Sequence, residues 1–200
     1  MSLVLGRTYE FQPSFILGFH GCDEATGRCV LDGNEHLQPS RKDYDWLGHG
    51  IYFWEGNYAR AMAWAQDRQK QGKIKVPFVL GAIIDLRHCL DLFDLQSMRE
   101  VEAAHAGLKR ALRLAGESLP KNRGRTPDKT ARYLDCKVMN FLHQSRDEDR
   151  DDPRLKFDSV RGAFLEGKPI YPGAGFRRET HIQICVRNTD CIKGYFRPLD

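Results

Sequence analysis

The chain has 200 residues, of which 41% are hydrophobic, so it is long enough to bury the core of one domain. No apolar run reaches membrane-spanning length, and residues 1–12 lack the charged and apolar regions of a secretory signal. The six cysteines include no CxxC pair, which argues against a zinc ribbon or a disulfide framework, although Cys22 and Cys29 could bridge in an oxidising compartment. We therefore expect a cytoplasmic protein with reduced thiols and no membrane contact.

The net charge of +4 is unevenly distributed along the chain. Residues 109–137 carry nine Lys and Arg side chains but only three acidic ones. This density of positive charge is typical of a surface that binds nucleic acid, and it also occurs on solvated helical faces. Charge alone leaves both interpretations open.

The first part of the chain predicts two strands and a loop. Residues 4–11 and the unbroken apolar run 15–19 are the predicted strands. Residues 22–43 are polar and contain several glycines, so we predict a loop with a short helical turn near Ala25. A loop of this length within a compact domain is often functional.

A glycine pair, Gly48 and Gly50, introduces the next elements. The run 51–54 that follows is β-branched and aromatic, which suits a half-buried strand. An alanine-rich amphipathic pattern then predicts a helix over 57–72. Residues 76–86 are too apolar for an edge strand, so we expect them in the interior of a sheet.

The second half of the chain begins with helical patterns and returns to strands. Apolar residues recur at helical spacing in 94–119 and 128–144, and a Pro- and Gly-containing break separates the two segments. We interpret residues 92–152 as a helical insertion packed on the sheet, because its apolar stripes are too few for an independent core. The remaining predicted elements are strands over 157–164, 180–186 and 191–196, and a loop over 167–175.

Two motifs carry a resemblance to a known family. An apolar strand ends in His20-Gly21, and a second strand opens with Gly48-His49-Gly50-Ile51-Tyr52-Phe53. This combination resembles the ADP-ribosyltransferase fold, specifically the branch with a His-Tyr-Glu signature shared by diphtheria toxin and the poly(ADP-ribose) polymerases. The order of elements over 15–86 and 157–196 is also similar. The resemblance implies an α+β fold with a split β-sheet core and flanking helices, as a single domain over residues 1–200.

The resemblance also implies an activity. We expect a small mono-ADP-ribosyltransferase of bacterial or phage-conflict type, which cleaves NAD as its substrate, releases nicotinamide and transfers ADP-ribose to a macromolecule. Positioning and electrostatic stabilisation of an oxocarbenium-like transition state would supply most of the rate. No metal is predicted, because this chemistry needs none. The basic segment favours RNA or DNA over protein as the acceptor. A role as a toxin or anti-phage effector would imply an antitoxin or inhibitor protein as a partner.

Residues in the first two motifs match the NAD-binding positions of the family. His20 matches the histidine that hydrogen-bonds the adenosine-side ribose, and Gly21 matches the glycine whose backbone pairs with the nicotinamide carboxamide. Tyr52, after Gly50, matches the tyrosine that stacks on nicotinamide, which a flat aromatic face does well. The family places a second aromatic residue on the following helix, and Trp64 is the candidate for that role.

The catalytic residue on the later strand has two candidates. Alternation puts Glu179, His181 and Gln183 on one face of the predicted strand. Glu179 fits the family glutamate by its chemistry and by its place at the strand start, and Gln183 fits by its spacing from the last strand. We favour Glu179, with Gln183 and His181 bordering the same pocket. Arg178, which follows Arg177, is placed to contact a phosphate group.

Two other functions compete with this interpretation. A non-catalytic module that binds NAD or ADP-ribose would keep the fold and lose the chemistry, and the choice between Glu179 and Gln183 keeps this alternative open. An RNA-repair phosphotransferase on the same fold would be expected to show additional arginines in the first motifs. Release of nicotinamide from NAD without an acceptor would separate an enzyme from a binding module.

Overall fold

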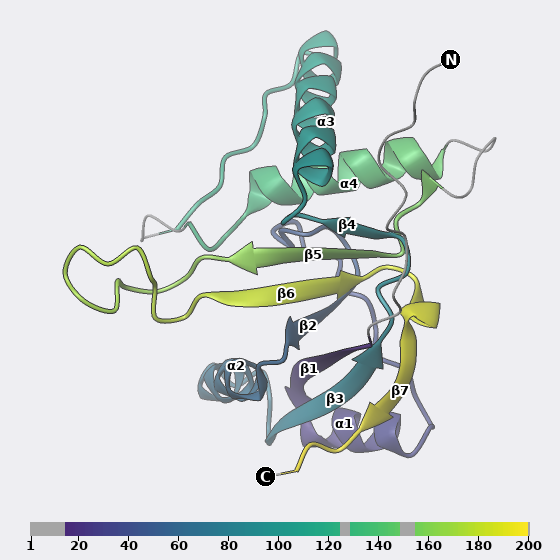
Figure 1. Ribbon diagram of the computed structural model, residues 1–200, viewed down its shortest axis with the longest axis vertical. Coiled ribbons are helices and arrows are strands. Elements are labelled where there is room, and N and C mark those ends of the chain that lie inside the picture. Colours follow the sequence, from purple (N-terminus) through teal and green to yellow (C-terminus); the bar gives the residue numbers. More distant parts are fainter. Residues whose placement is uncertain (1–14, 125–128, 149–154, 200) are drawn as a thin grey trace.

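A computed structural model describes residues 15–124, 129–148 and 155–199 (Figure 1). The predicted strand over 4–11 lies outside these residues. The strands are β1 (Ile16–Asp23), β2 (Ile51–Glu55), β3 (Pro77–Ile84), β4 (Cys89–Asp91), β5 (Ser159–Phe164), β6 (His181–Val186) and β7 (Ile192–Phe196). The helices are α1 (Glu24–Leu31), α2 (Tyr58–Lys70), α3 (Leu95–Leu114) and α4 (Tyr133–Asp147), with a short 3-10 helix, η2 (Thr189–Cys191).

The described strands form one seven-stranded sheet, in the order β4-β5-β6-β2-β1-β3-β7. All neighbouring strands are antiparallel except β4 and β5, which are parallel. The predicted α+β class is confirmed at this level. The order makes β6, β2 and β1 neighbours although the sequence separates β2 from β6 by more than half the chain, so residues from distant motifs meet on adjacent strands.

The predicted strands around the glycine pair are confirmed, and β1 extends beyond the predicted run. β3 lies between β1 and β7, as expected for an inner strand, and its residues Leu80, Ala82 and Ile84 are completely buried. α2 begins after Asn57, whose side-chain oxygen accepts a hydrogen bond from the backbone N–H of Arg60 at 3.0 Å. This cap satisfies a backbone donor that the first helical turn leaves without a partner.

α1 occupies the first part of the segment predicted as loop, and the helical turn predicted near Ala25 lies within it. Its eight residues begin after Asp23, whose carboxylate accepts from the backbone N–H of Ala25 at 3.2 Å. The same carboxylate accepts from the backbone N–H of Lys75 at 2.6 Å, which ties the helix start to the turn before β3. A helix this short shows little periodicity, so a cap and a tertiary contact define it rather than a sequence pattern.

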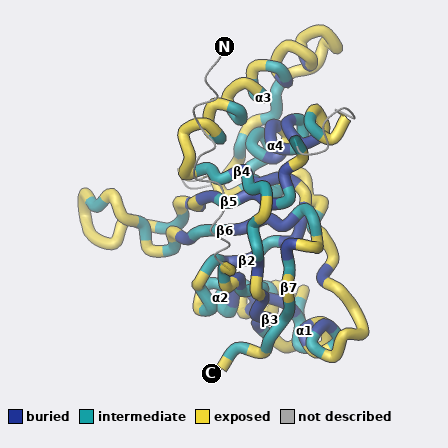
Figure 2. The backbone as a smooth tube through the Cα atoms, turned by 45° about the vertical axis from the view of Figure 1, so that its right-hand side comes forward, coloured by how far each residue is buried: buried dark blue, intermediate teal, exposed yellow. Residues whose placement is uncertain are grey.

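The two predicted helices of the second half are present as α3 and α4, and α4 begins five residues later than expected, at Tyr133. Leu108 and Leu112 of α3 pack with Val138 of α4 in a small cluster of their own. Figure 2 shows that α4 is largely buried against the sheet, whereas the free end of α3 and the β5–β6 loop are exposed. The described cysteines are free, so the alternative Cys22–Cys29 bridge is not formed.

Candidate functional site

The site begins where β1 and β2 separate. The two strands pair only at Gly18 with Glu55 and at Phe19 with Trp54. Immediately after these pairs, the Nδ1 atom of His20 lies 2.7 Å from the carbonyl oxygen of Tyr52. Because a carbonyl oxygen can only accept, Nδ1 carries the proton and donates it. The side chain of His20 therefore spans a gap that the strand ladder leaves open.

The backbone of Gly21 faces this gap. In an antiparallel strand, the N–H and C=O of successive residues point alternately toward the two neighbouring strands. The carbonyl of Leu17 accepts from Gly56 on the β2 side, so the odd-numbered residues of β1 turn their polar groups toward β2. Gly21 lies two residues past the last β1–β2 pair. A Cβ atom on Gly21 would lie 2.5 Å from the carbonyl oxygen of Ala61, so only glycine lets α2 pack this closely.

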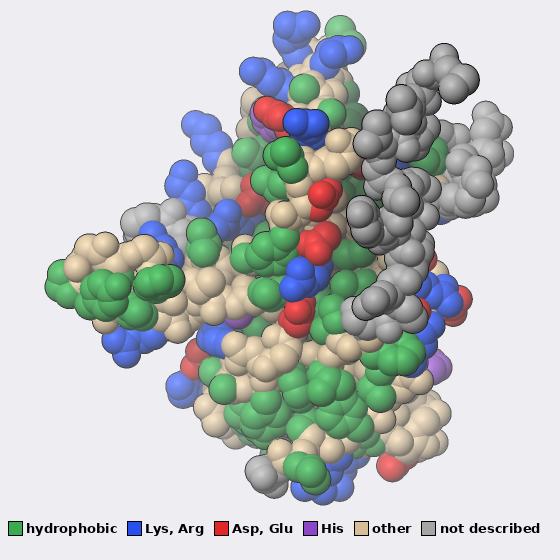
Figure 3. Space-filling view, viewed as in Figure 1, with side chains coloured by type: hydrophobic (Ala, Val, Ile, Leu, Met, Phe, Trp, Pro, Cys, Tyr) green, Lys and Arg blue, Asp and Glu red, His purple; other side chains and the backbone are tan. Residues whose placement is uncertain are grey.

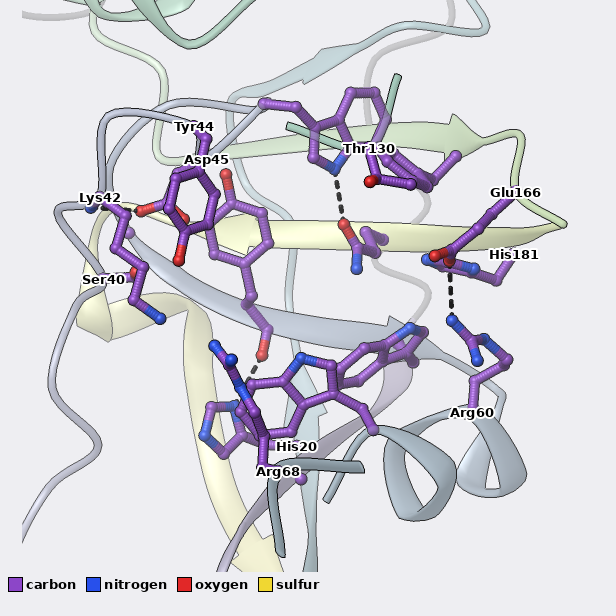
Figure 4. Close-up of a pocket in the computed structure, with 18 of the residues that line it drawn as sticks. His20, Ser40, Lys42, Tyr44, Asp45, Arg60, Arg68, Thr130, Glu166 and His181 are labelled. Atoms are coloured by element: carbon purple, nitrogen blue, oxygen red, sulfur yellow. Dashed lines mark hydrogen bonds and ion pairs between the residues drawn. The ribbon is translucent and has the colours of Figure 1, made fainter. Parts of the chain in front are cut away.

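A cavity of about 300 Å³ opens at the gap (Figure 4). This volume is at the lower end of the range for ligand pockets. Most of the predicted site residues line it, from β1, β2 and the glycine before it, α2 and β6. They are His20, Gly21, Gly50, Tyr52, Trp64, His181 and Gln183.

Two predicted site residues do not line the cavity. β6 begins at His181, so Glu179 lies in the preceding turn, where its backbone carbonyl accepts from Nδ1 of His181 at 2.7 Å. Arg178 is exposed on the β5–β6 loop. Strand alternation could not choose between Glu179 and Gln183, because both positions have the same parity. The position where β6 begins brings Gln183, rather than Glu179, into the cavity.

The orientation of the Gln183 side chain is fixed by a tryptophan. The indole Nε1 of Trp46 lies 2.6 Å from Oε1 of Gln183. An indole N–H can only donate, so the amide oxygen of Gln183 must face Trp46. The NH₂ group of Gln183 is then directed away from Trp46 and remains a donor. Trp46 lies in the long loop before Gly48, and no sequence pattern identified it as a site residue.

Tyr52 is held by its hydroxyl group at the other side of the glycine turn. The hydroxyl donates to the carbonyl of Gly48 at 2.7 Å and accepts from the backbone N–H of Leu47 at 3.0 Å. Gly48 has a φ of +86°, in the region that favours glycine. Burial raises the pKa of Tyr52 well above its usual value, so the phenol stays neutral. The ring is thus locked in place as a fixed wall of the cavity.

A second aromatic residue comes from α2, as the sequence predicted. Trp64 lines the cavity, and its ring lies 5.9 Å from that of Trp54. The guanidinium group of Arg68 lies 5.0 Å over the Trp64 ring and also lines the cavity. This stacking keeps a positive charge close to an aromatic surface.

The far end of the cavity contains a carboxylate that the sequence analysis missed. Glu166 follows β5 and forms an ion pair of 2.8 Å with Arg60 of α2 (Figure 4). Nothing in the local sequence around Glu166 distinguishes it from other surface acids. The ion pair connects the start of the β5–β6 loop to α2.

Two neutral histidines give the cavity hydrogen-bond acceptors. Burial lowers the pKa of His20, and it lowers that of His181 to about 4. Each histidine donates through Nδ1 to a backbone carbonyl, so Nε2 is left as the acceptor. The Nε2 atom of His181 is buried and has no hydrogen-bond partner among the described residues. Buried polar atoms usually have partners, so this atom favours a ligand that donates a hydrogen bond.

Within residues 15–124, 129–148 and 155–199, no group of three or more His, Cys, Asp or Glu side chains could hold a metal ion. In the same part of the chain, the helices are too short or too polar to cross a lipid bilayer.

Comparison with known proteins identifies a distant relative. It is the Uncharacterized protein MJ0359 of Methanocaldococcus jannaschii, which is 25% identical over 190 residues that cover 88% of this chain and 83% of the archaeal protein. No family model matches the chain, and no solved structure matches it.

Proposed function

We propose that the protein is an NAD-dependent mono-ADP-ribosyltransferase. The single observation that supports this best is the convergence of His20, Gly21, Tyr52 and Gln183 on one cavity. These residues come from strands that are adjacent in the sheet and distant in the sequence. The cavity forms at a gap between β1 and β2, and this is where the resemblance to ADP-ribosyltransferases implies that NAD binds.

The nicotinamide end of NAD fits the groups on β1 and β2. A carboxamide has one acceptor and two donors, and the backbone N–H and C=O of Gly21 could pair with it. The rigid ring of Tyr52 offers a flat surface for the pyridinium ring. Trp64 provides a second aromatic surface on α2.

The sugar and phosphate groups find complementary partners in the same cavity. Nε2 of His20 can accept a hydrogen bond from a ribose hydroxyl, and the NH₂ group of Gln183 can donate one to a hydroxyl oxygen. Lys42 and Arg68 also line the cavity, and the structure records no ion pair for either among the described residues. They are the cations that we assign to the pyrophosphate, in place of Arg178.

The reaction breaks the bond between C1′ of the ribose and the nicotinamide nitrogen. The electron pair leaves with nicotinamide, a nucleophilic atom of the acceptor bonds to C1′, and the acceptor proton passes to solvent. Gln183 would orient the ribose hydroxyl, but an amide carries no charge to stabilise the developing cation. Asp45 and Glu166 are the carboxylates on the cavity wall, so any charge stabilisation from this chain would come from them.

The neutral side chain at Gln183 also supports a second candidate function. A module that binds NAD or ADP-ribose without cleaving it needs the same aromatic and hydrogen-bonding groups, and it needs no catalytic carboxylate. Binding and cleavage must therefore be measured separately.

The test is release of nicotinamide from NAD, followed by chromatography, together with NAD binding by calorimetry. We expect the wild-type protein to release nicotinamide and Gln183→Ala to lose at least about tenfold of the rate, which corresponds to ~1.4 kcal/mol. Gln66→Ala, on the exposed face of α2, is the matched control and should retain the wild-type rate.

The other outcomes are equally informative. If Glu179→Ala abolishes release and Gln183→Ala does not, the catalytic position is the one outside the cavity and our site is wrong. Binding of NAD without release assigns the protein to the non-catalytic module. If the protein neither binds NAD nor releases nicotinamide, the proposal is overturned.

A further inference from the structure

A second and larger cavity lies beside the first. Its volume is about 800 Å³, it is open to solvent, and it is bordered by the end of α3, the connection that follows it, the first half of α4 and the loop before β2. Apolar side chains from α3 and the connection form part of its wall. Its polar and charged lining residues are Asp43, His49, Glu117, Ser118, Lys121, Asn122, Arg123, Tyr133, Lys137 and Asn140.

Among the described residues, the cations of this cavity have no carboxylate partners. Lys121, Arg123 and Lys137 are exposed, and the described part of the chain offers none of them an ion pair. Arg132 nearby is different, since it pairs with Asp135 at 3.1 Å. Unpaired cations keep their charge available for an anionic partner, and their number exceeds that of the acidic lining residues.

More unpaired cations continue from the cavity along α3. Lys109, Arg110 and Arg113 surround a small neighbouring depression and are also exposed without an ion pair among the described residues. Figure 3 shows Lys and Arg side chains gathered over the free end of α3 and the connection to α4. The positive charge is therefore extended along one side of the molecule, as a polyanion would require.

Two aromatic rings, with a cation stacked at each end, lie between the two cavities. The guanidinium group of Arg123 lies 5.7 Å from the centre of the Tyr133 ring. The Tyr133 ring meets that of Tyr44 edge to face at 6.1 Å, and the ammonium group of Lys42 lies 5.9 Å from Tyr44. Tyr44 and Lys42 line the first cavity, and Arg123 and Tyr133 line the second. The row Arg123–Tyr133–Tyr44–Lys42 thus leads from one cavity into the other.

We propose that the second cavity binds the acceptor of the reaction, and that this acceptor is a single-stranded nucleic acid. Cations that contact phosphates, combined with rings on which bases stack, are the arrangement that single strands prefer. A duplex keeps its bases stacked internally, so it could use the cations but not the rings. An acidic protein segment without aromatic side chains could likewise use the cations but not the rings.

This inference rests on the proposed transferase function, because a strand bound along the row of rings and cations is an acceptor only if the first cavity holds NAD and transfers ADP-ribose. Its test does not depend on that function. Fluorescence anisotropy of a labelled single strand of about twelve nucleotides, RNA or DNA, measures binding without NAD.

The decisive comparison is between two double variants that remove the same charge. Lys121→Ala/Lys137→Ala changes the second cavity, and Lys73→Ala/Arg197→Ala changes two exposed cations, one in the turn before β3 and one directly after β7. Figure 1 shows the start of β3 and the C-terminus at the opposite end of the long axis from the free end of α3. Each phosphate contact on a single strand contributes about 0.7 to the slope of log affinity against log salt. Between about 50 and 200 mM salt, the wild-type affinity should therefore fall about sevenfold more than that of the cavity variant. The control variant should keep the wild-type salt dependence.

Stacking is tested at Tyr133. We expect Tyr133→Ala to weaken single-strand binding by about fivefold or more, and Tyr133→Phe, which keeps the ring, to bind like the wild type. Circular dichroism shows whether the alanine variant is folded, and the Lys121→Ala/Lys137→Ala comparison stands if it is not.

Three results of the binding experiments would overturn the inference. They are no binding of single strands, equal losses in the two double variants, or duplex binding as tight as single-strand binding. Transfer of label from NAD to protein alone, in a lysate that also contains RNA and DNA, would assign the acceptor to protein instead. Binding of single strands by a protein that releases no nicotinamide would leave the single-strand site standing, while the proposed function and the acceptor role that depends on it both fail.

Discussion

At the scale of single residues, the least expected feature is the pairing of Trp46 with Gln183. An amide has two ends of similar shape, and only its hydrogen-bond partners decide which end faces a ligand. The indole N–H selects the oxygen, at 2.6 Å, and so presents the amide NH₂ group as the donor. Trp46 would thereby act as a positioning residue for Gln183.

We predict that Trp46→Phe slows nicotinamide release by about fivefold. It removes one hydrogen bond worth ~1 kcal/mol and allows the Gln183 amide to rotate, so that its oxygen and NH₂ group exchange places. The change should appear in kcat more than in KM for NAD. In a background of Gln183→Ala, the same substitution should cause no further loss, since the two residues act as one unit. An additive loss in this double-mutant cycle would mean that Trp46 acts through the packing of its ring on Phe164.

We also predict that Gln183→Glu increases nicotinamide release by about tenfold, the effect of ~1.4 kcal/mol. A carboxylate at this half-buried position could still accept from Trp46, and it would add a negative charge near the developing cation. The measurement is single-turnover release with saturating NAD. A rate equal to that of Gln183→Ala would show that the donor NH₂ group, rather than charge, is what position 183 contributes.

At the scale of elements, the gap between β1 and β2 depends on close packing of α2 against β1. We predict that Gly21→Ala destabilises the protein by about 1–3 kcal/mol and weakens NAD binding, because its Cβ would lie 2.5 Å from a backbone oxygen of α2. The control is Gly194→Ala in β7, where an added Cβ meets no atom within 4 Å and φ is not positive. Urea denaturation should place that variant within about 0.5 kcal/mol of the wild type. Equal stability of the two variants would contradict the predicted clash.

The sequence allowed most elements to be predicted where periodicity extends over a long run, as in α2, α3 and β3. β4 was missed because its three residues are held by parallel pairing with β5, and this contact does not appear in a local pattern. The cavity was predicted through its motif residues, but Trp46 and Glu166 were not. Their roles arise from the sheet order and the course of the loops, which bring distant segments together.

At the scale of the whole molecule, buried neutral histidines make stability depend on pH. His143 of α4 is 4% exposed and lies beneath the Gly48 turn that carries Tyr52. Burial, and then the charge of Arg187, lower the pKa of His143 to about 3, and burial lowers that of His181 to about 4. Both values are below the ordinary value of 6.5, so the unfolded chain binds protons that the folded protein does not.

The sign of the pH dependence follows from these values. A histidine with a lowered pKa contributes its full stability above about pH 6.5 and loses it as the pH falls toward the folded-state value. We predict that unfolding free energy decreases between pH 7 and pH 4, with a contribution from His143 of roughly 3 kcal/mol at pH 4. His143→Leu should remove this contribution, so the unfolding free energy of the variant should decrease less on acidification than that of the wild type. Carboxylates are protonated over the same pH range in both proteins. The difference between their unfolding free energies, measured by urea denaturation at each pH, therefore isolates the contribution of His143. Parallel curves would show that His143 is as easily protonated in the folded protein as in the unfolded chain, and that α4 does not hold it in an environment that excludes charge.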